Sequence, residues 1–155
     1  MKLRIVALSH RLPAWVAAAY DDYARRLPRD FALELFEVKP EARNQGKSVA
    51  QILTAEGTRI STATSGFHVV ALDEHGAAWT TAQLAAELRR WRDEALSVAF
   101  VIGSADGLSS AIKRGAAAVV ALSALTLPHG LARVVLTEQL YRAVSLLQGH
   151  PYHRE

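Results

Sequence analysis

Two short segments in the last third of this 155-residue chain have residue types that fit a ligand pocket. Residues 103–107 (GSADG) follow the apolar run 98–102, and residues 123–129 (SALTLPH) follow a second apolar run at 117–122. Glycine has no Cβ and tolerates positive φ, so a glycine-bounded loop lets the backbone approach a ligand closely. In open α/β sheets, ligands bind at the carboxyl ends of the strands. The two segments therefore predict a small-molecule pocket, which the rest of the chain supports.

Each segment also has a purely structural interpretation. A tight strand-to-helix turn explains residues 103–107 about as well, and their place in the chain excludes a dinucleotide fingerprint, which would follow the first strand. In this chain the first expected strand is followed by Ser9, His10 and Arg11, with no glycine. No Gly-Lys-Ser/Thr follows, and Ser104 is not in a Gly-x-Ser-x-Gly elbow. Residues 123–129 are too apolar for an exposed turn, so we expect them to be buried, either as a core crossover or against a ligand that pairs with the loop backbone.

The last six residues, 150–155 (HPYHRE), place two imidazoles, a phenol and a guanidinium close together. Histidine moves protons near neutral pH, arginine holds phosphate through two hydrogen bonds, and tyrosine stacks on bases. The alternative is a frayed terminus without a function. The chain has no cysteine, and no carboxylate cluster joins the two histidines, so we expect no metal site.

Strand-like and helix-like patterns alternate along the chain. This alternation predicts one α/β domain over residues 1–155, with a mostly parallel sheet flanked by helices. Capping boxes that begin at Ser48 and Thr80 start two of the helices. Helix periodicity predicts that Trp15 and Ala95 lie on buried faces. The expected strands are 2–8, 31–38, 67–72, 98–102 and 119–122, with a turn at 73–76 and a final helix at 130–148.

The final helix is apolar on two nearly opposite faces. One face carries Leu136, Leu140, Ala143, Val144 and Leu147, and the other carries Leu131, Val135 and Leu146. Glu138 and Arg142 are spaced for an i,i+4 ion pair on the second face. A helix with two apolar faces must be covered on both sides, and one sheet covers only one. A central helix within one monomer is the alternative, but a C-terminal helix is rarely central. We therefore expect a homodimer through this helix.

Charge and hydropathy add little about partners. The formal net charge of +3 does not by itself indicate a nucleic-acid partner. Residues 39–47 (KPEARNQGK) form a polar, basic loop that we expect to be mobile. We favour a solvated loop over an arm that touches phosphates, because no aromatic residue is interleaved. No apolar run reaches membrane-spanning length and no signal-peptide pattern opens the chain, so we expect a cytoplasmic protein without a membrane partner.

In the two loops and the closing residues described above, the chain resembles the RlmH (YbeA-like) family. These proteins are ribosomal large-subunit pseudouridine N3-methyltransferases within the SPOUT class. The similarity covers essentially the whole length. Its most specific parts are residues 122–129 (LSALTLPH), 138–143 (EQLYRA) and 150–155 (HPYHRE). Together they are far more specific than a lone glycine motif.

The resemblance implies that the C-terminal half is threaded as a deep trefoil knot, a rare exception to unknotted topology. It implies that the knotted loops bind S-adenosyl-L-methionine, and that the C-terminal tail of one subunit of a homodimer reaches the cofactor pocket of the other. The implied substrate is a pseudouridine in the helix 69 stem-loop of 23S rRNA within the assembled ribosome. Carried over onto this sequence, the cofactor contacts are Leu72, Gly103, Leu122, Ser123, Ala124, Leu125, Thr126 and Leu127.

Methylation of N3 of pseudouridine requires that the N3 proton leaves, so the implied reaction needs a base or a stabilised anion. The candidate groups are His129 and His153 as bases, Arg142 and Arg154 as partners for negative charge on the base carbonyls, and Tyr152 as a stacking surface. Simpler roles remain open for two of them. Arg142 would then only pair with Glu138, and His129 would only cap the last helix.

The first loop departs from the family pattern, which usually reads Gly-Gly-x-x-Gly. Ser104 adds a Cβ where an unusual φ would strain the backbone, and Asp106 is one methylene shorter than the usual Glu. Gly103 and Gly107 remain, so we expect cofactor binding to survive. The departure keeps one alternative open, a non-catalytic dimeric RNA- or ribosome-binding module with the same fold. A hydride-transferring enzyme is disfavoured by the missing first-strand glycines.

Overall fold

A five-stranded sheet forms the centre of the molecule, and every pair of neighbouring strands is parallel. The computed structural model describes residues 1–154, so Glu155 of the closing motif lies outside the described residues. The spatial order of the strands is β2-β1-β4-β3-β5, so β2 and β5 are the edge strands. The strands are β1 (Lys2–Leu8), β2 (Ala32–Val38), β3 (His68–Ala78), β4 (Val98–Ile102) and β5 (Ala118–Ala121).

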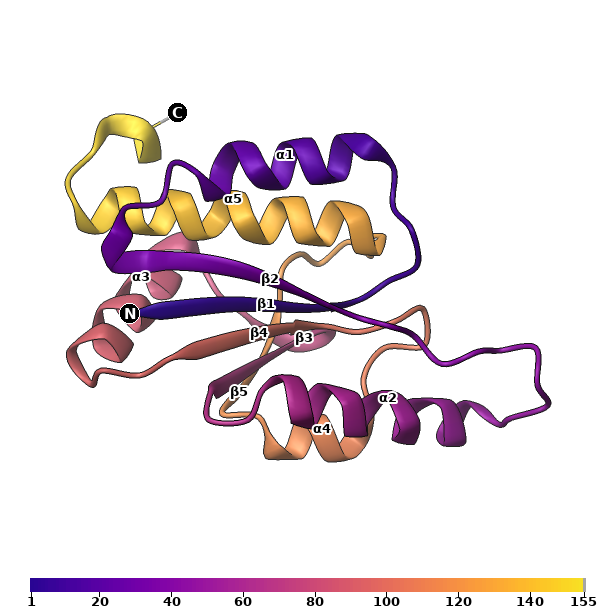
Figure 1. Ribbon diagram of the computed structural model, residues 1–155. Helices are drawn as coiled ribbons and strands as arrows, with labels where there is room; N and C mark the ends of the chain where they lie inside the picture. The colour runs from indigo at the N-terminus through magenta and orange to yellow at the C-terminus, as the bar shows by residue number, and fades with distance from the viewer. Residues whose placement is uncertain (155) are drawn as a thin grey trace.

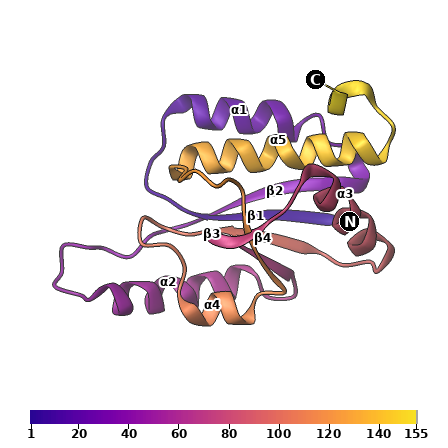
Figure 2. The ribbon, with the colours of Figure 1, turned by 180° about the vertical axis from the view of Figure 1, so that it is seen from behind.

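Helices cover both faces of this sheet, as Figures 1 and 2 show from opposite sides. One face carries α1 (Ala14–Ala24), α3 (Thr81–Asp93) and α5 (His129–Leu147), and the other carries α2 (Val49–Ala63) and α4 (Ser110–Gly115). Short 3₁₀ turns, η1 (Arg29–Phe31) and η2 (Pro151–Arg154), complete the elements. The predicted α/β architecture with flanking helices is therefore confirmed.

The two faces of the sheet explain why its central strands are apolar throughout. Leu3 and Ile5 pack with Trp91 and Leu140 on the α3–α5 side. Val6 and its neighbours on the same strand face belong to the core on the α2 side. A strand that is covered on both faces reads as a continuous apolar run rather than an alternating one. Each fully buried Leu, Ile or Val stabilises the fold by about 1.5–3 kcal/mol relative to leaving it exposed.

The local start signals of two helices act as expected. The Ser48 hydroxyl accepts a hydrogen bond from the Gln51 backbone N–H, and the Gln51 side chain accepts one from the Ser48 N–H. Thr80 and Gln83 form the same capping box at α3. Two burial predictions are wrong. The Trp15 side chain is 54% exposed on α1, and Ala95 is exposed beyond the end of α3 with φ at 56°.

The turn expected at residues 73–76 is also wrong, because β3 continues to Ala78. The pairing of β3 with β5 is irregular there, since Leu72 and Ala77 both pair with Val120. Gly76 makes the continued strand possible. A Cβ at Gly76 would lie 2.7 Å from the backbone carbonyl carbon of Val119, so only glycine fits against β5 at this point.

Because all five strands are parallel, their carboxyl ends meet at one edge of the sheet. The loops that follow β4 and β5 leave from that edge, next to the irregular part of β3. The N-terminus of α5 returns to the same edge (Figure 1). Within residues 1–154, no helix is long and apolar enough to cross a bilayer.

Candidate active site

A cleft of about 700 Å³ opens at the carboxyl ends of β3, β4 and β5. Its volume lies within the range of ordinary small-molecule sites. Seven of the eight residues expected to contact the cofactor line it, together with His129. The seven are Leu72, Gly103, Leu122, Ser123, Leu125, Thr126 and Leu127; Ala124 is exposed beside them and does not line the cleft. The structure therefore brings three separate segments of the chain to one cavity.

Two glycines fix the shape of the loop that follows β4. A Cβ at Gly103 would lie 2.5 Å from the Gly107 carbonyl oxygen, a distance that real Cβ atoms do not show. Gly107 has φ at +80°, which favours glycine, and its N–H donates to the Ser104 carbonyl oxygen at 2.9 Å. The loop is a tight, closed turn whose residues 103–107 all line the cleft.

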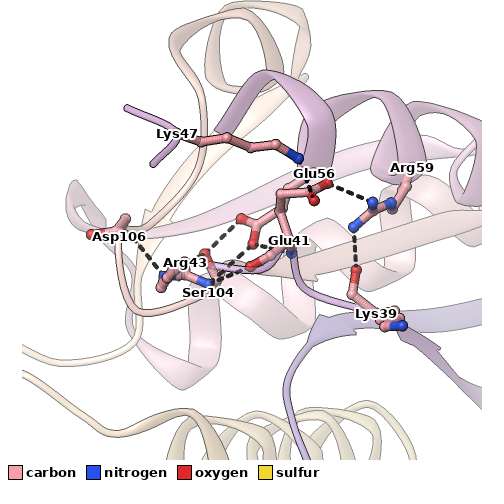
Figure 3. Close-up of polar contacts among 8 residues, drawn as sticks. All are labelled: Lys39, Glu41, Arg43, Lys47, Glu56, Arg59, Ser104 and Asp106. Carbon is pink, nitrogen blue, oxygen red and sulfur yellow. Dashed lines mark hydrogen bonds and ion pairs between the residues drawn. The ribbon is translucent and has the colours of Figure 1, made fainter. Parts of the chain in front are cut away.

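Ser104 does not strain this turn, contrary to expectation. Its φ is not positive, and its side chain is buried. The Ser104 hydroxyl donates to a carboxylate oxygen of Glu56 at 2.6 Å and accepts from the Arg43 guanidinium at 2.8 Å (Figure 3). The departure from the family pattern thus places a hydroxyl between two charged side chains, and the backbone tolerates the added Cβ.

The loop after β5 is more open than its apolar sequence predicts. Leu125 is 75% exposed, so the expectation of a buried segment is wrong for a single copy of the chain. The Ser123 hydroxyl accepts from the Leu125 backbone N–H at 2.9 Å, which turns the loop. The Thr126 hydroxyl donates to Glu74 at 2.9 Å and so links this loop to the irregular part of β3. Within the described residues, Leu127 packs against the core, whereas the Leu125 side chain has no apolar cover.

The residues directly after Leu72 also line the cleft, although the family resemblance did not assign them to the site. Asp73, Glu74 and His75 contribute polar groups to a wall that also carries apolar side chains such as Leu72 and Leu122. Burial raises the pKa of Asp73, but the His75 backbone N–H and the Lys113 ammonium, 3.3 Å away, outweigh it and hold that pKa below its usual value. Their position at the carboxyl end of a buried strand was the available signal, which the predicted turn obscured.

His129 is the first residue of α5 and lines the cleft. No side chain caps this end of the helix, and no acidic residue lies in its first turn. The interpretation of His129 as a cap is therefore wrong. Helix N-termini present unpaired N–H groups with a partial positive charge, which favours negative charge nearby. This end of the cleft therefore suits a group that carries or develops negative charge.

The C-terminal tail lies at the opposite end of α5. Gly149, with φ at +69°, ends the helix, and the His150 N–H donates to the Ser145 carbonyl at 2.9 Å in a Schellman arrangement. A helix of 19 residues rises about 28 Å. The tail then turns back onto α5, where Tyr152 contacts Glu138, Tyr141 and Arg142, about 14–20 Å along the helix axis from His129.

Tyr152 holds the tail on α5. Its hydroxyl donates to Glu138 at 3.1 Å, and its ring lies 4.6 Å from that of Tyr141, between ring centroids. The Arg142 guanidinium lies 4.8 Å from the ring centroid and pairs with Glu138 at 2.6 Å, as the i,i+4 spacing predicted. Burial, a hydrogen bond with Tyr23 and the Glu138 charge all raise the pKa of Tyr152, so the phenol stays protonated.

The geometry of His153 fixes its tautomer. Its Nδ1 lies 2.6 Å from the His150 carbonyl oxygen. A carbonyl oxygen only accepts hydrogen bonds, so Nδ1 carries the proton in the neutral ring. The Nε2 atom is then unprotonated and able to accept a proton. Arg154 is exposed beside it.

No group of three or more His, Asp or Glu side chains within residues 1–154 is arranged to hold a metal ion.

Comparisons with known proteins agree with this geometry. Residues 1–153 match the family model described as "Predicted SPOUT methyltransferase". The chain is 52% identical over 155 residues to the ribosomal RNA large subunit methyltransferase H of Nitrosospira multiformis. It is 51% identical over 155 residues to the protein of the same name from Burkholderia mallei, and both alignments cover 99% of each chain.

Solved structures show the same fold at low identity. A probable methyltransferase from Bordetella pertussis Tohama I superposes with a TM-score of 0.62 at 20% identity, over 92% of this chain and 96% of that one. A probable methylase family protein from Haemophilus influenzae Rd KW20 gives a TM-score of 0.60 at 10% identity, over 97% of this chain and 69% of that one. Together with the full-length sequence matches, these findings show that the chain belongs to the SPOUT methyltransferase family, among the ribosomal RNA large subunit methyltransferase H proteins.

Proposed function

We propose that the protein is an S-adenosyl-L-methionine-dependent methyltransferase that methylates N3 of a pseudouridine in the helix 69 stem-loop of 23S rRNA, on the assembled ribosome in the cytoplasm. Its relatives are named as methyltransferases of large-subunit ribosomal RNA. The observation that carries the proposal is the single cleft at the carboxyl ends of β3, β4 and β5, formed by the segments that the family resemblance assigned to the cofactor.

The lining of the cleft fits the proposed cofactor. Leu72, Leu122 and Leu127 offer apolar surface for an adenine ring. The carboxylates of Asp73 and Glu74 suit a cationic sulfonium or ammonium group. S-adenosyl-L-methionine, when bound, supplies an electrophilic methyl group. The chain's own residues then have to position the target base and remove its N3 proton.

Two histidines are proposed for proton removal. His129 lies at the cleft and is one candidate base. His153 is the other, because its Nδ1–H contact with a carbonyl leaves Nε2 free to accept the N3 proton. The loss of that proton places negative charge on the pyrimidine carbonyls, which Arg142 and Arg154 are proposed to offset. Tyr152 is proposed to stack on the flipped base in the assembled site.

We propose that the tail acts on the cleft of a second copy. In one chain, the tail packs on α5 about 14–20 Å along the helix axis from His129 and does not line the cleft. The second apolar face of α5 supports a homodimer, since Leu131 is 38% exposed and Val135 lines an apolar groove of about 470 Å³. A copy of the same chain that covers this face would also cover exposed apolar side chains near the cleft, such as Leu125.

The alternative, a non-catalytic dimeric RNA- or ribosome-binding module, was left open by Ser104. Ser104 has no positive φ and is hydrogen-bonded on both sides, so it gives no reason to expect a defective cleft. Calorimetry with S-adenosyl-L-methionine separates the two functions. A methyltransferase binds the compound, whereas a pure binding module gives no heat.

The substrate is tested by methyl transfer to ribosomes. Labelled S-adenosyl-L-methionine is incubated with the protein and either assembled ribosomes or naked 23S rRNA from cells that lack this modification. We expect strong incorporation at helix 69 only in the assembled particles, because a small protein with a modest net charge has little surface for gripping free RNA. Incorporation at another base, or into neither substrate, would contradict the proposal.

A further inference from the structure

We propose that Arg43 and Glu56 are positioning residues that set the affinity of the cleft for its cofactor by clamping the glycine loop, residues 103–107. This inference rests on the proposed function, since it assigns a role in cofactor binding. Neither side chain lines the cleft, so both act through the loop. Figure 3 shows the cluster they form with Ser104, Asp106 and the polar loop of residues 39–47.

Glu56 is the buried anchor of this cluster. It lies on α2 with only 1% of its surface exposed. Its carboxylate accepts from the Ser104 hydroxyl at 2.6 Å and from the Glu41 backbone N–H at 3.0 Å, and it lies 3.5 Å from the Arg43 guanidinium. A buried charge is costly unless it is paired and hydrogen-bonded, and here it is both. The cluster therefore has one strongly preferred arrangement.

Arg43 holds the glycine loop at two points. Its Nη2 donates to the Ser104 hydroxyl at 2.8 Å, and its Nε donates to the Asp106 carboxylate at 3.0 Å. A guanidinium presents its donors in a rigid planar fork, so both bonds fix the loop relative to Arg43. The two contacts lie on either side of Ala105, within the turn that Gly103 and Gly107 close.

Two of the three cations of the polar loop, Arg43 and Lys47, form ion pairs within the protein. Lys47 lies 2.9 Å and Arg59 of α2 2.6 Å from carboxylate oxygens of Glu41, while Arg43 pairs with Glu56 and Asp106. These pairs balance positive against negative charge, which argues against an arm for nucleic-acid phosphates. These pairs instead connect the polar loop to α2 and to the cleft wall. The polar loop therefore has a structural role.

The clamp reaches the cofactor through the loop backbone. Gly103 is covalently joined to Ser104, and all five loop residues line the cleft. A loop that is already ordered in the free protein loses less conformational entropy when the ligand binds. A clamped glycine loop is therefore expected to bind the cofactor more tightly than a mobile one. Loss of the clamp is therefore expected to weaken cofactor binding and to leave the rate at saturating cofactor unchanged.

The test measures cofactor affinity and turnover in the full-length protein. Arg43→Ala is compared with the wild type by calorimetric titration with S-adenosyl-L-methionine and by methyl transfer to ribosomes. We expect a Kd and a cofactor KM about tenfold higher, with kcat unchanged, from the loss of two charge-assisted hydrogen bonds to the loop. Lys47→Ala is the matched control, because Lys47 lies in the same polar loop and pairs with Glu41 rather than with the glycine loop. Its Kd should equal that of the wild type.

A second variant separates the clamp from general damage. Ser104→Ala removes the hydroxyl between Arg43 and Glu56 and should raise the Kd in the same direction. The double variant should bind little more weakly than Arg43→Ala, since both changes release the same loop. If Arg43→Ala does not fold, the Kd of Ser104→Ala alone tests the clamp: a raised Kd supports it, and a wild-type Kd contradicts it.

The outcomes distinguish this inference from the proposed function. If the wild type gives no binding heat, the proposed function fails and the inference fails with it. If the wild type binds and Arg43→Ala binds equally well, only the clamp is wrong. A fall in kcat with unchanged Kd, or fully additive effects in the double variant, would also overturn the positioning role.

Discussion

The two ends of α5 carry different parts of the proposed active site. At its N-terminal end, His129 faces a cleft whose walls come from three strand ends, with a turn closed by two glycines. At its C-terminal end the chain turns back, and Tyr152 and His153 are held by hydrogen bonds to Glu138 of α5 and to the tail itself, outside the lining of that cleft. The N-terminal end has the cavity, whereas the tail groups proposed for the reaction lie outside it.

This difference teaches how one small chain can provide a complete reaction site. In the proposed site, a single copy builds the cofactor cleft at the N-terminal end of α5 and carries the proposed proton-transfer groups on its tail, which does not line that cleft. In the proposed homodimer, the twofold axis would bring the tail of each copy to the cleft of the other. The two halves should then fail in different ways. Changes at the cleft should alter cofactor binding, and changes at the tail should alter turnover.

The largest effect is expected from Gly103→Ala at the cleft. The new Cβ would lie 2.5 Å from the Gly107 carbonyl oxygen, so the turn has to open. We expect binding of S-adenosyl-L-methionine to weaken by about 100-fold or more, because the cleft wall itself is displaced. Calorimetric titration measures this change.

Gly115→Ala is the matched control for that variant. Gly115 ends α4, has no positive φ and has open space around its Cβ position. Its cofactor affinity should equal that of the wild type. Equal affinity in Gly103→Ala as well would show that the glycine turn does not shape the site.

A smaller effect, on turnover rather than on cofactor binding, is expected from His153→Ala in the tail. The loss of a proton-accepting Nε2 should lower turnover about 100-fold, within the usual range for general base catalysis. Cofactor Kd should stay nearly unchanged, since the tail does not line the cleft of its own chain. Single-turnover methylation of ribosomes together with calorimetry checks both expectations. Wild-type turnover in this variant would remove His153 from the mechanism.

The smallest effect concerns the pH dependence of stability at Asp73. Its pKa is lower in the folded protein than its ordinary value of 3.8, so Asp73 stabilises the fold above that pH. This contribution is lost as the pH falls through the depressed folded pKa. Asp73→Asn should lower Tm by roughly 2 °C at pH 7 and by less toward pH 3. A Tm difference that grows at low pH would contradict the assignment.

The sequence predicts most of the fold because its signals are local. The apolar runs give β1 and β4 with the correct bounds, and Ser48 and Thr80 begin capped helices. The segment 73–76 was misread because Asp-Glu-His-Gly is typical of a turn. Its strand conformation instead depends on close contact between Gly76 and β5, which is a tertiary contact.

The site was predictable only in part, for a similar reason. The glycine loop and the loop after β5 carry recognisable motifs, so the residues of the cleft were found. Arg43 and Ser104 are 61 positions apart, and no local pattern announces their hydrogen bond. The apolar sequence of the loop after β5 predicts that its side chains are buried. It does not predict that Leu125 is 75% exposed in a single chain.

The most direct test of the divided site is complementation between two inactive variants. One subunit carries Gly103→Ala, which breaks the cleft, and the other carries His153→Ala, which disables the tail. If the tail serves the partner's cleft, mixed dimers contain one intact site, and an equal mixture recovers about a quarter of wild-type methylation of ribosomes. Activity no higher than that of the two variants alone would contradict a site shared between two chains.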